Sequence, residues 1–244
     1  MLQLPRYIAH RGLHSSTDAP ENSFAAFQNA VDNGFAIELD VRFTADRRMV
    51  VFHDADTERM CGIKLEIPKT SYEELAALRI IGTDERIPLL TEVLKLVAGR
   101  VMLFIELKSC PEVVDAEKRL AHLMKRYNGD FAVQSFDPFS LKRLRAADEN
   151  MILGQLVSTY SKGESSALRK LAANRSVWKR ISKPDYLAWD LHSITLEAAF
   201  EANNIDAALI SWTADGKELV EAAEPFSDAI IFENVPLEYF NIKR

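Results

Sequence analysis

Residues 35–53 read FAIELDVRFTADRRMVVFH, and this stretch decides how the chain is divided into strands and helices. It holds two apolar runs, 35–41 and 49–52, separated by the seven residues 42–48. Neighbouring parallel strands need a connection of a dozen or more residues, so the second run is expected to return antiparallel to the first. The turn would lie near Thr44-Ala45-Asp46-Arg47. The second run therefore does not count as a strand of the parallel sheet.

Outward from this hairpin, short apolar runs alternate with helix-length segments whose apolar residues recur at helical spacing. Such alternation predicts βαβ units and a parallel sheet. With 49–52 set apart, eight strands remain, which predicts a TIM (β/α)8 barrel formed by residues 1–244 as a single domain. The other expected strands are 6–9, 101–107, 131–135, 152–157, 186–189, 207–212 and 229–232.

Residues 54–87 lack strong periodicity and contain Gly62, Pro68 and Gly82, so they are expected to form a small insertion after the second strand. Pro88 fits the start of a following helix over 88–97. The insertion has its own apolar residues, which must be buried against something. We therefore expect it to cap the C-terminal rim of the barrel, burying Met60, Ile63, Leu65, Tyr72, Leu75 and Leu78.

The composition narrows the functional class. A net charge of −6 in 244 residues argues against a nucleic-acid partner, which usually requires a basic face. Cys61 and Cys110 stand outside any zinc-type cluster. No apolar run approaches 18 residues and no signal-peptide pattern opens the chain, so a cytoplasmic protein without membrane insertion is expected. A homodimer is left open.

Carboxylates lie toward the C-terminal ends of two predicted strands, where TIM barrels carry their active sites. Glu38 and Asp40 are two residues apart on one strand and so share a face, and Glu106 ends the next barrel strand. Three oxygen ligands suit a hard divalent cation, Mg²⁺ or Ca²⁺. The alternative is that these carboxylates form ion pairs with Arg42, Lys108 or another cation at the rim.

Two histidines are expected near these carboxylates. His10 follows the first strand, and the hairpin should return His53 to a place beside Asp40. Such a pair could share general acid and general base work on a phosphate ester, although each alone would more often be a structural histidine. The sequence predicts no partner for His14, His122 or His192, and assigns them no role.

The same strand ends carry candidate substrate-binding residues. Arg11 could bind phosphate oxygens in a bidentate manner and Lys108 could supply a compact charge, although both could instead pair with carboxylates. Trp212 could form an apolar wall, or serve as a core aromatic residue. Asn22 and Ser23 open the first helix, where capping alone accounts for both.

Taken together, these segments resemble the glycerophosphodiester phosphodiesterase family over nearly the whole chain. The segments that carry the resemblance are His10-Arg11-Gly12, Pro20-Glu21-Asn22-Ser23, Glu38-Leu39-Asp40-Val41, His53-Asp54, Ile87-Pro88-Leu89, Glu92-Val93-Leu94, Glu106-Leu107-Lys108, Gln134-Ser135-Phe136 and Trp212-Thr213. The resemblance implies a divalent ion on Glu38, Asp40 and Glu106. It implies catalytic histidines at 10 and 53, and phosphate contacts from residues 11 and 108. The implied reaction converts a glycerophosphodiester to glycerol 3-phosphate and an alcohol.

Some positions depart from the family pattern. Asp46-Arg47 replaces an expected Asp-Gly in the hairpin turn, Asp215 follows Trp-Thr where Asn is frequent, and Asn234 lies in a variant segment before the last proline. Two alternatives stay open: a lyase-like phosphodiesterase acting on phospholipids or lysophospholipids, and a non-catalytic ligand-binding barrel. The sequence leaves the headgroup, the cation and the assignment of acid and base undecided.

Overall fold

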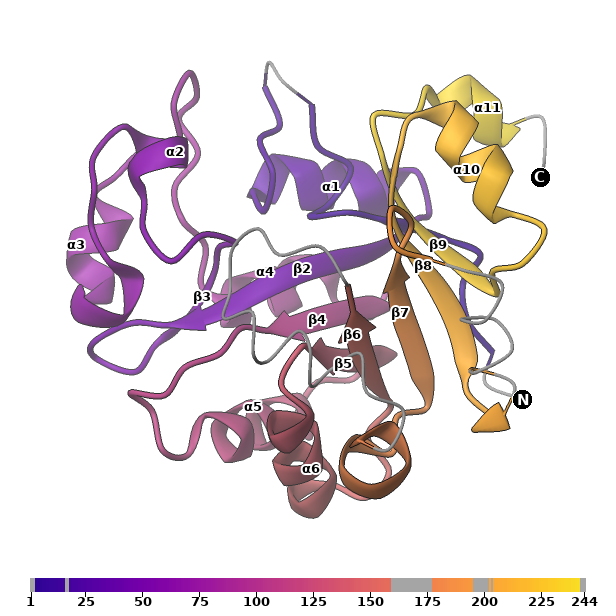
Figure 1. Ribbon diagram of the computed structural model, residues 1–244. Coiled ribbons are helices and arrows are strands. Elements are labelled where there is room, and N and C mark those ends of the chain that lie inside the picture. The colour runs from indigo at the N-terminus through magenta and orange to yellow at the C-terminus, as the bar shows by residue number, and fades with distance from the viewer. Residues whose placement is uncertain (1–2, 16–17, 159–176, 195–201, 203, 242–244) are drawn as a thin grey trace. The chain divides into compact units, whose positions relative to one another are not determined.

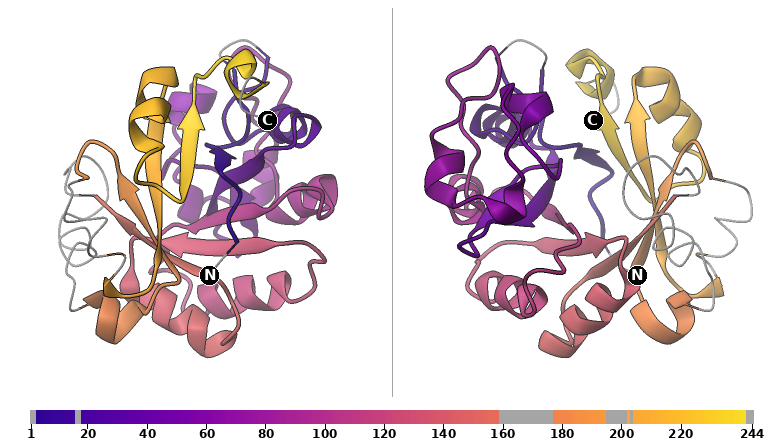
Figure 2. Two further views of the ribbon diagram at one scale, coloured as in Figure 1. Left: turned by 90° about the vertical axis from the view of Figure 1, so that its right-hand side faces the viewer. Right: turned by 60° about the vertical axis from the view of Figure 1, so that its left-hand side comes forward.

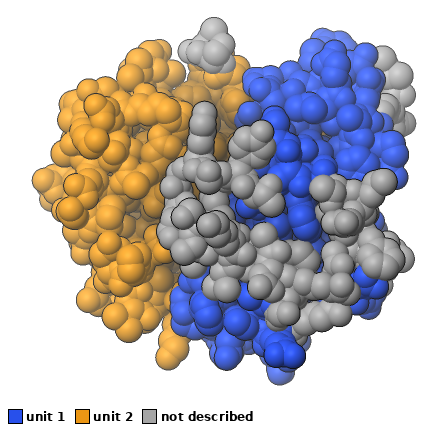
Figure 3. Space-filling view, viewed as in Figure 1, with its two compact units in different colours: residues 1–8, 133–244 blue, residues 9–132 orange. Residues whose placement is uncertain are grey.

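The structure is a computed structural model that describes residues 3–15, 18–158, 177–194, 202 and 204–241. Its internal contacts divide the chain into two compact units, which Figure 3 shows in different colours. Unit 1 comprises residues 1–8 and 133–244, and unit 2 comprises residues 9–132. Strands β1 (Tyr7–Ala9) and β5 (Phe131–Ser135) contain the two boundaries. The expectation of a single domain stays a prediction.

The strand order identifies the fold class. Along the sheet it is β1-β9-β8-β7-β6-β5-β4-β2-β3, and β1 also pairs with β2, so eight strands form a closed series with β3 as an addition. Every expected strand is present within two residues of its predicted ends or extends beyond them. The TIM barrel predicted from strand–helix alternation is confirmed.

Unit 2 is built around β2 (Ala36–Phe43), β3 (Met49–Val51) and β4 (Leu103–Leu107), labelled in Figure 1. β3 pairs antiparallel to β2, with Val41 opposite Val51, as the short connection predicts. β2 and β4 run parallel with Asp40 opposite Glu106. This register places two of the predicted ligands side by side. The helices of the unit are α1 (Phe24–Asp32), α2 (Glu58–Cys61), the 3₁₀-helix η1 (Ile67–Lys69), α3 (Tyr72–Ala76), α4 (Leu90–Val97) and α5 (Ala116–Met124).

The turn between β2 and β3 forms without the glycine that the family pattern would place there. Arg47 adopts the left-handed conformation, with φ of 59°. The Thr44 hydroxyl group accepts a hydrogen bond from the Arg48 N–H at 2.9 Å and donates one to Asp46 at 2.5 Å. These bonds hold the backbone in a conformation that a non-glycine residue adopts only at a cost.

The inserted segment 54–87 has a small core of its own, which it shares with β3 and the residues that follow that strand. The fully packed members are Val50, Phe52, Ile67, Leu75, Ile87 and Leu89. Of the predicted apolar residues, Met60, Leu65, Tyr72 and Leu78 pack against this core. Ile63 does not: its side chain is 55% exposed, because α2 ends at Gly62 in a left-handed conformation and the chain then turns outward. The expected burial of Ile63 was wrong.

The helix predicted over 88–97 begins two residues later than expected. Pro88 accepts a hydrogen bond at its carbonyl from the N–H of Val51, and Leu89 forms a bridge with Val50. Both residues therefore pair with β3 before the helix starts at Leu90. The Glu92 carboxylate accepts the Leu89 N–H at 3.0 Å and so caps the first turn.

Unit 1 holds the remaining parallel strands, β6 (Leu153–Val157), β7 (Tyr186–Asp190), β8 (Ala208–Asp215) and β9 (Ala229–Glu233). Figure 2 gives two further views in which β9 lies beside β8. Its helices are α6 (Pro138–Ala147), the π-helix η2 (Trp178–Ser182), α10 (Lys217–Ala223) and α11 (Leu237–Asn241). Gly154 is required in β6, because a Cβ atom there would fall inside the ring of the buried Tyr186 on β7.

No helix in the part of the chain that the structure describes is long and apolar enough to cross a membrane.

Candidate active site

The three carboxylates that the sequence singles out lie together in unit 2. Glu38, Asp40 and Glu106 each place an oxygen atom within 4.8 Å of the others, and all three side chains are buried. They come together because Glu38 and Asp40 share one face of β2 and Asp40 lies opposite Glu106 in the sheet. A set of three buried oxygen donors could hold a metal ion.

Two cationic side chains touch this carboxylate cluster. The ammonium group of Lys108 lies 2.8 Å from Asp40 Oδ1 and 2.5 Å from Glu106 Oε1, and its side chain is also buried. Arg11 Nε lies 3.5 Å from Asp40 Oδ2. The ion pairing that the sequence left open for Lys108 is therefore present. Arg42, the other named candidate, donates to the carbonyl oxygen of His53 at 2.9 Å.

The pKa values of Glu38 and Asp40 are shifted in opposite directions. Burial, together with the charges of Asp40 and Glu106, raises the pKa of Glu38 well above its ordinary value. Burial also acts to raise the pKa of Asp40, but the charge of Lys108 and the other cations near it overcome this and lower that pKa well below its usual range. Even with two cations present, the cluster does not fully stabilise the charge on Glu38. Additional positive charge at these three oxygens would do so, and a divalent cation fits the donor set.

The loop after β1 brings Arg11 to the cluster. Its backbone N–H donates to Glu38 Oε2 at 3.2 Å, so Arg11 contacts the cluster through backbone and side chain. Arg11 itself has a φ of 53°, and Gly12 follows with a φ of 82°. A Cβ at Gly12 would lie 2.9 Å from the backbone of Ala26, so only glycine allows this loop to pack on α1.

Asn22 contacts the cluster directly, which sequence reasoning missed. Ser23 is the N-cap of α1 and accepts the Ala26 N–H at 3.1 Å, as predicted. Asn22, by contrast, donates through its side-chain amide to Asp40 Oδ2 at 2.8 Å. Capping therefore accounts for Ser23 alone. Asn22 has a left-handed backbone conformation, with φ of 57°, directly before the N-cap residue, and no spacing in the sequence indicates its contact with Asp40.

The hairpin returns His53 to the neighbourhood of Asp40, as expected. The N–H of Phe52 donates to the Asp40 carbonyl at 2.9 Å, and the charge of His53 contributes to lowering the pKa of the Asp40 carboxyl group. His53 Nδ1 lies 2.7 Å from Asp54 Oδ1. A carboxylate at Nδ1 favours the tautomer in which Nε2 is available to a substrate.

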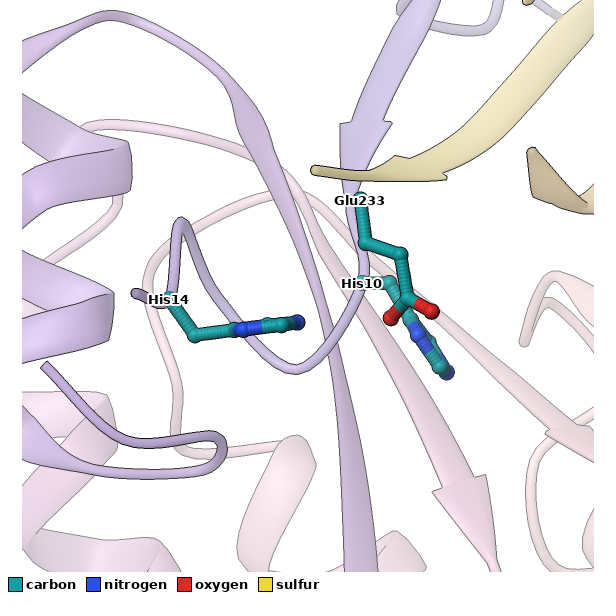
Figure 4. Close-up of side chains that lie close together, drawn as sticks. All are labelled: His10, His14 and Glu233. Carbon is teal, nitrogen blue, oxygen red and sulfur yellow. The ribbon is translucent and has the colours of Figure 1, made fainter. Parts of the chain in front are cut away.

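His10 lies beside a second histidine of the same loop. A ring nitrogen of His10 and one of His14 are within 4.8 Å of each other. Figure 4 shows both, together with Glu233, which belongs to unit 1. The sequence assigned His14 no partner, and this expectation was wrong. The same expectation was wrong for His192, whose Nδ1 lies 3.3 Å from Asp190 Oδ1 in unit 1, whereas His122 is exposed on α5.

Trp212 belongs to unit 1 and is held in place there. Its indole N–H donates to the Ala188 carbonyl at 2.7 Å, and its ring meets Phe136 edge to face at 5.7 Å between centroids. The half-buried ring is thus fixed by β7 and by the residue after β5, which leaves both sequence interpretations of Trp212 consistent with its surroundings.

Comparison with known proteins shows which family the chain resembles in sequence. The model of the glycerophosphoryl diester phosphodiesterase family matches residues 10–224. The chain is 31% identical over 229 residues to the Bacillus subtilis putative glycerophosphodiester phosphodiesterase YhdW, covering 84% of this chain and 93% of that protein. It is 40% identical over 103 residues to lysophospholipase D GDPD1 of Rattus norvegicus, covering 37% of this chain and 32% of that relative.

A solved structure shares the fold over nearly the full length. The Oleispira antarctica phosphodiesterase OLEI02445, in complex with the product sn-glycerol-3-phosphate, superimposes with a TM-score of 0.81. The alignment covers 99% of this chain and 98% of that one, at 21% sequence identity.

Proposed function

Because the chain belongs to the glycerophosphoryl diester phosphodiesterase family and is an enzyme of that class, we propose that it hydrolyses a glycerophosphodiester to glycerol 3-phosphate and an alcohol. The observation that carries the proposal is the buried cluster of Glu38, Asp40 and Glu106, with Lys108 and Arg11 against it. A cluster that combines oxygen donors with cations suits an anionic phosphodiester. The non-catalytic barrel is set aside, since the family is one of enzymes.

We assign one divalent cation, Mg²⁺ or Ca²⁺, to the three carboxylates. Their raised and lowered pKa values support this assignment, because the cluster lacks positive charge where Glu38 lies. When bound, such an ion supplies Lewis-acid stabilisation of charge on a phosphate oxygen. Lys108 holds Asp40 and Glu106 in place and adds a compact charge for the phosphate. Arg11 offers a guanidinium group for the other phosphate oxygens.

His10 and His53 are the proposed acid and base. The leaving alkoxide requires a proton and the attacking hydroxyl must lose one, and each of these transfers contributes roughly 10²–10⁴-fold to the rate. Asp54 orients His53 so that Nε2 faces the reaction. The nucleophile is either water or the neighbouring hydroxyl of the glycerol group. The second route gives a cyclic phosphate first, and we favour it because an intramolecular nucleophile gains from its effective concentration.

Trp212 and the inserted segment 54–87 complete the proposal. Trp212 would form an apolar wall for the glycerol chain. The insertion would cap the site and influence headgroup choice, and exchange of this segment with that of a relative should alter headgroup preference more than metal dependence. The cytoplasmic location and the absence of a nucleic-acid partner stay predictions, and a homodimer stays open.

The test is a panel of glycerophosphodiesters assayed with Mg²⁺, with Ca²⁺ and after exhaustive chelation. We expect cation-dependent release of glycerol 3-phosphate, and large losses of kcat in His10→Ala and His53→Ala. His122→Ala, an exposed histidine on α5, is the matched control and should retain full activity. Full turnover after chelation would refute the assigned cation, and inactivity of the wild type on the whole panel would refute the substrate class.

A second candidate function is hydrolysis of a lysophospholipid. Its support is the match to a relative named lysophospholipase D and the exposure of two apolar side chains of the insertion, Ile63 at 55% and Ile81 at 63%. A Cβ at Gly62, the residue before Ile63, would lie 3.6 Å from the side chain of Ile81. Turnover on lysophospholipid vesicles but not on soluble diesters, with loss in Ile63→Ser and Ile81→Ser, would favour this function over the first.

A further inference from the structure

Arg59 of the inserted segment connects two parts of unit 2 through a single guanidinium group. It lies on α2, and its Nη1 and Nη2 donate to the two carboxylate oxygens of Glu21 at 2.9 and 2.7 Å. Its Nε donates to Asp54 Oδ2 at 2.6 Å. Glu21 lies in the loop between β1 and α1, whereas Asp54 follows the β2–β3 hairpin. One side chain therefore binds two carboxylates that are 33 positions apart in the sequence.

Each of these carboxylates also holds a residue of the proposed site. Glu21 accepts from Arg11 Nη1 at 2.8 Å. Asp54 contacts His53 Nδ1 at 2.7 Å. Arg59 is thus one contact removed from both the proposed phosphate-binding arginine and the proposed acid–base histidine, and touches neither reacting atom itself.

Electrostatics shows why the link depends on Arg59. Against the opposing effect of burial, the pKa of Glu21 is lowered by Arg59 and then Arg11, and that of Asp54 by its hydrogen bond with His53 and then by Arg59. Both are therefore carboxylates, and without the guanidinium two like charges would face each other. A lysine could not replace it, because an ammonium group lacks the planar fork that contacts two carboxylates at once.

We propose that Arg59 is a positioning residue that clamps the inserted segment to the loop after β1, and thereby fixes His53 and Arg11 in register with each other. The inference rests on the roles proposed above for His53 and Arg11. It gives segment 54–87 a catalytic purpose, since α2 exists in the right place only if the insertion folds. A shift of about 1 Å in a reacting group can lower a rate by roughly a hundredfold, so a clamp outside the reaction centre can matter to turnover.

The alternative is an ordinary surface ion pair. The Arg59 side chain is 48% exposed, and exposed pairs contribute little to stability. The two cases differ in what they change. A surface pair would leave both stability and turnover nearly intact, whereas a positioning clamp lowers kcat without a comparable loss of stability.

The chain supplies a matched control. Lys64 lies in the same insertion and is 62% exposed, with carboxylates of Asp56 and Glu58 at 3.5 and 3.2 Å. Its two partners both lie within the insertion, so it forms the same kind of contact without reaching the site. Lys64→Gln should therefore leave turnover unchanged.

The experiment compares the wild type with Arg59→Ala, Arg59→Lys and Lys64→Gln on the best glycerophosphodiester of the panel. We expect Arg59→Ala to lower kcat 10- to 100-fold with a smaller change in KM, and Arg59→Lys to recover only part of the loss. Millimolar guanidinium chloride should restore turnover of Arg59→Ala several-fold and saturably, whereas sodium chloride of equal ionic strength should not. Amide hydrogen exchange should become faster in residues 20–24 and 54–62 of Arg59→Ala, and not in Lys64→Gln.

Two outcomes would overturn the clamp: wild-type kcat in Arg59→Ala, or unchanged exchange in both segments. Should Arg59→Ala fail to fold, Arg59→Lys carries the same comparison. Failure of the proposed function looks different, because the wild type itself would be inactive on the panel. Hydrogen exchange would then still decide whether Arg59 links the two segments.

Discussion

The substitution Glu38→Gln should separate the stability of this protein from its function. Glu38 is buried, and burial together with the charges of Asp40 and Glu106 raises its pKa above the ordinary value of 4.5. The folded protein without metal therefore carries an unfavourable charge at this position. Glutamine keeps the size and an oxygen acceptor for the Arg11 N–H, which donates to Glu38 at 3.2 Å. We expect the variant to be more stable than the wild type in the absence of metal, and inactive.

The size of the effect follows from the distances in the cluster. The ligand oxygens lie within 4.8 Å of one another, and two unit charges at that separation or closer repel by at least about 3.5 kcal/mol at an effective dielectric constant of 20. Glu38 faces two such carboxylates, and attraction to Lys108 and Arg11 offsets part of the repulsion. A net gain of about 1–3 kcal/mol remains for the glutamine variant. In a chain of this size, a gain of that order raises Tm by roughly 2–12 °C.

The pH dependence of stability tests a second time whether Glu38→Gln is more stable than the wild type. The pKa of Glu38 is higher in the folded state than in the unfolded state. Below pH 4.5 the carboxyl group is protonated in both states, so the folded wild type has no cost of ionisation. As the pH rises through the folded pKa, the group ionises in the folded protein and the wild type loses stability. The advantage of Glu38→Gln should therefore be small near pH 4 and complete at high pH. Adding Mg²⁺ or Ca²⁺ should reverse the order, since only the wild type retains all three ligands.

Thermal unfolding in chelator at several pH values, repeated with saturating cation, measures all of these effects. Glu73→Gln, at an exposed position of α3, is the control and should change Tm by little. A lower Tm for Glu38→Gln in chelator at pH 8, or an advantage that grows as the pH falls, would refute the electrostatic account of the cluster.

Three further substitutions test other parts of the structure by the same unfolding assay. Lys108→Met should destabilise the metal-free protein by about 3–5 kcal/mol, because it leaves the carboxylate of Asp40 buried without its closest cation. A loss of stability below about 1 kcal/mol would contradict the ion pair at 2.8 Å. Arg47→Gly should stabilise the protein by up to about 1 kcal/mol by relieving a left-handed φ of 59°, and a loss would show that the turn depends on the side chain. Gly154→Ala should cost about 1–3 kcal/mol or more, since the methyl group meets the ring of Tyr186, and a neutral result would mean that β6 and β7 are less tightly packed than described.

The fold could be predicted from sequence because its decisive features are local. The seven residues between 35–41 and 49–52 are too few for a crossover helix, and this length alone separates β3 from the eight parallel strands. The prediction that failed, the burial of Ile63, also has a local cause. Ile63 is apolar but follows the left-handed Gly62, and no periodicity shows which way a short loop leaves a helix.

The site was predictable only in part. Glu38, Asp40 and Glu106 come together because strand alternation and register follow from the pattern of residues. Asn22 and Arg59 contact the cluster or its neighbours through loop conformations and through partners far away in sequence. Single-residue patterns carry no information on such contacts.

Two departures from the family pattern illustrate the same limit. Asp215 and Asn234 each look unusual in sequence when considered alone. In unit 1 the Asn234 amide donates to Asp215 Oδ1 at 2.8 Å, from a residue with φ of 54°. The two departures thus form one hydrogen-bonded pair at the ends of β8 and β9. Comparison with a family pattern one position at a time treats them as unrelated.

The charges of unit 2 suggest how the site is kept ordered before any ligand arrives. Asp40, Glu21 and Asp54 each contact an arginine or histidine, and the pKa of each is lowered despite burial. Glu38 differs from them, because its pKa is raised. Partners supplied by the chain therefore hold the surrounding carboxylates ionised and in position, while the deficit of positive charge is concentrated at Glu38. A site arranged in this way has its geometry set by the protein and its charge completed by a cation, so loss of the cation should reduce turnover far more than it disturbs the fold. Arg59→Ala should therefore lower turnover even when the variant is saturated with cation, which separates the effect of geometry from that of charge.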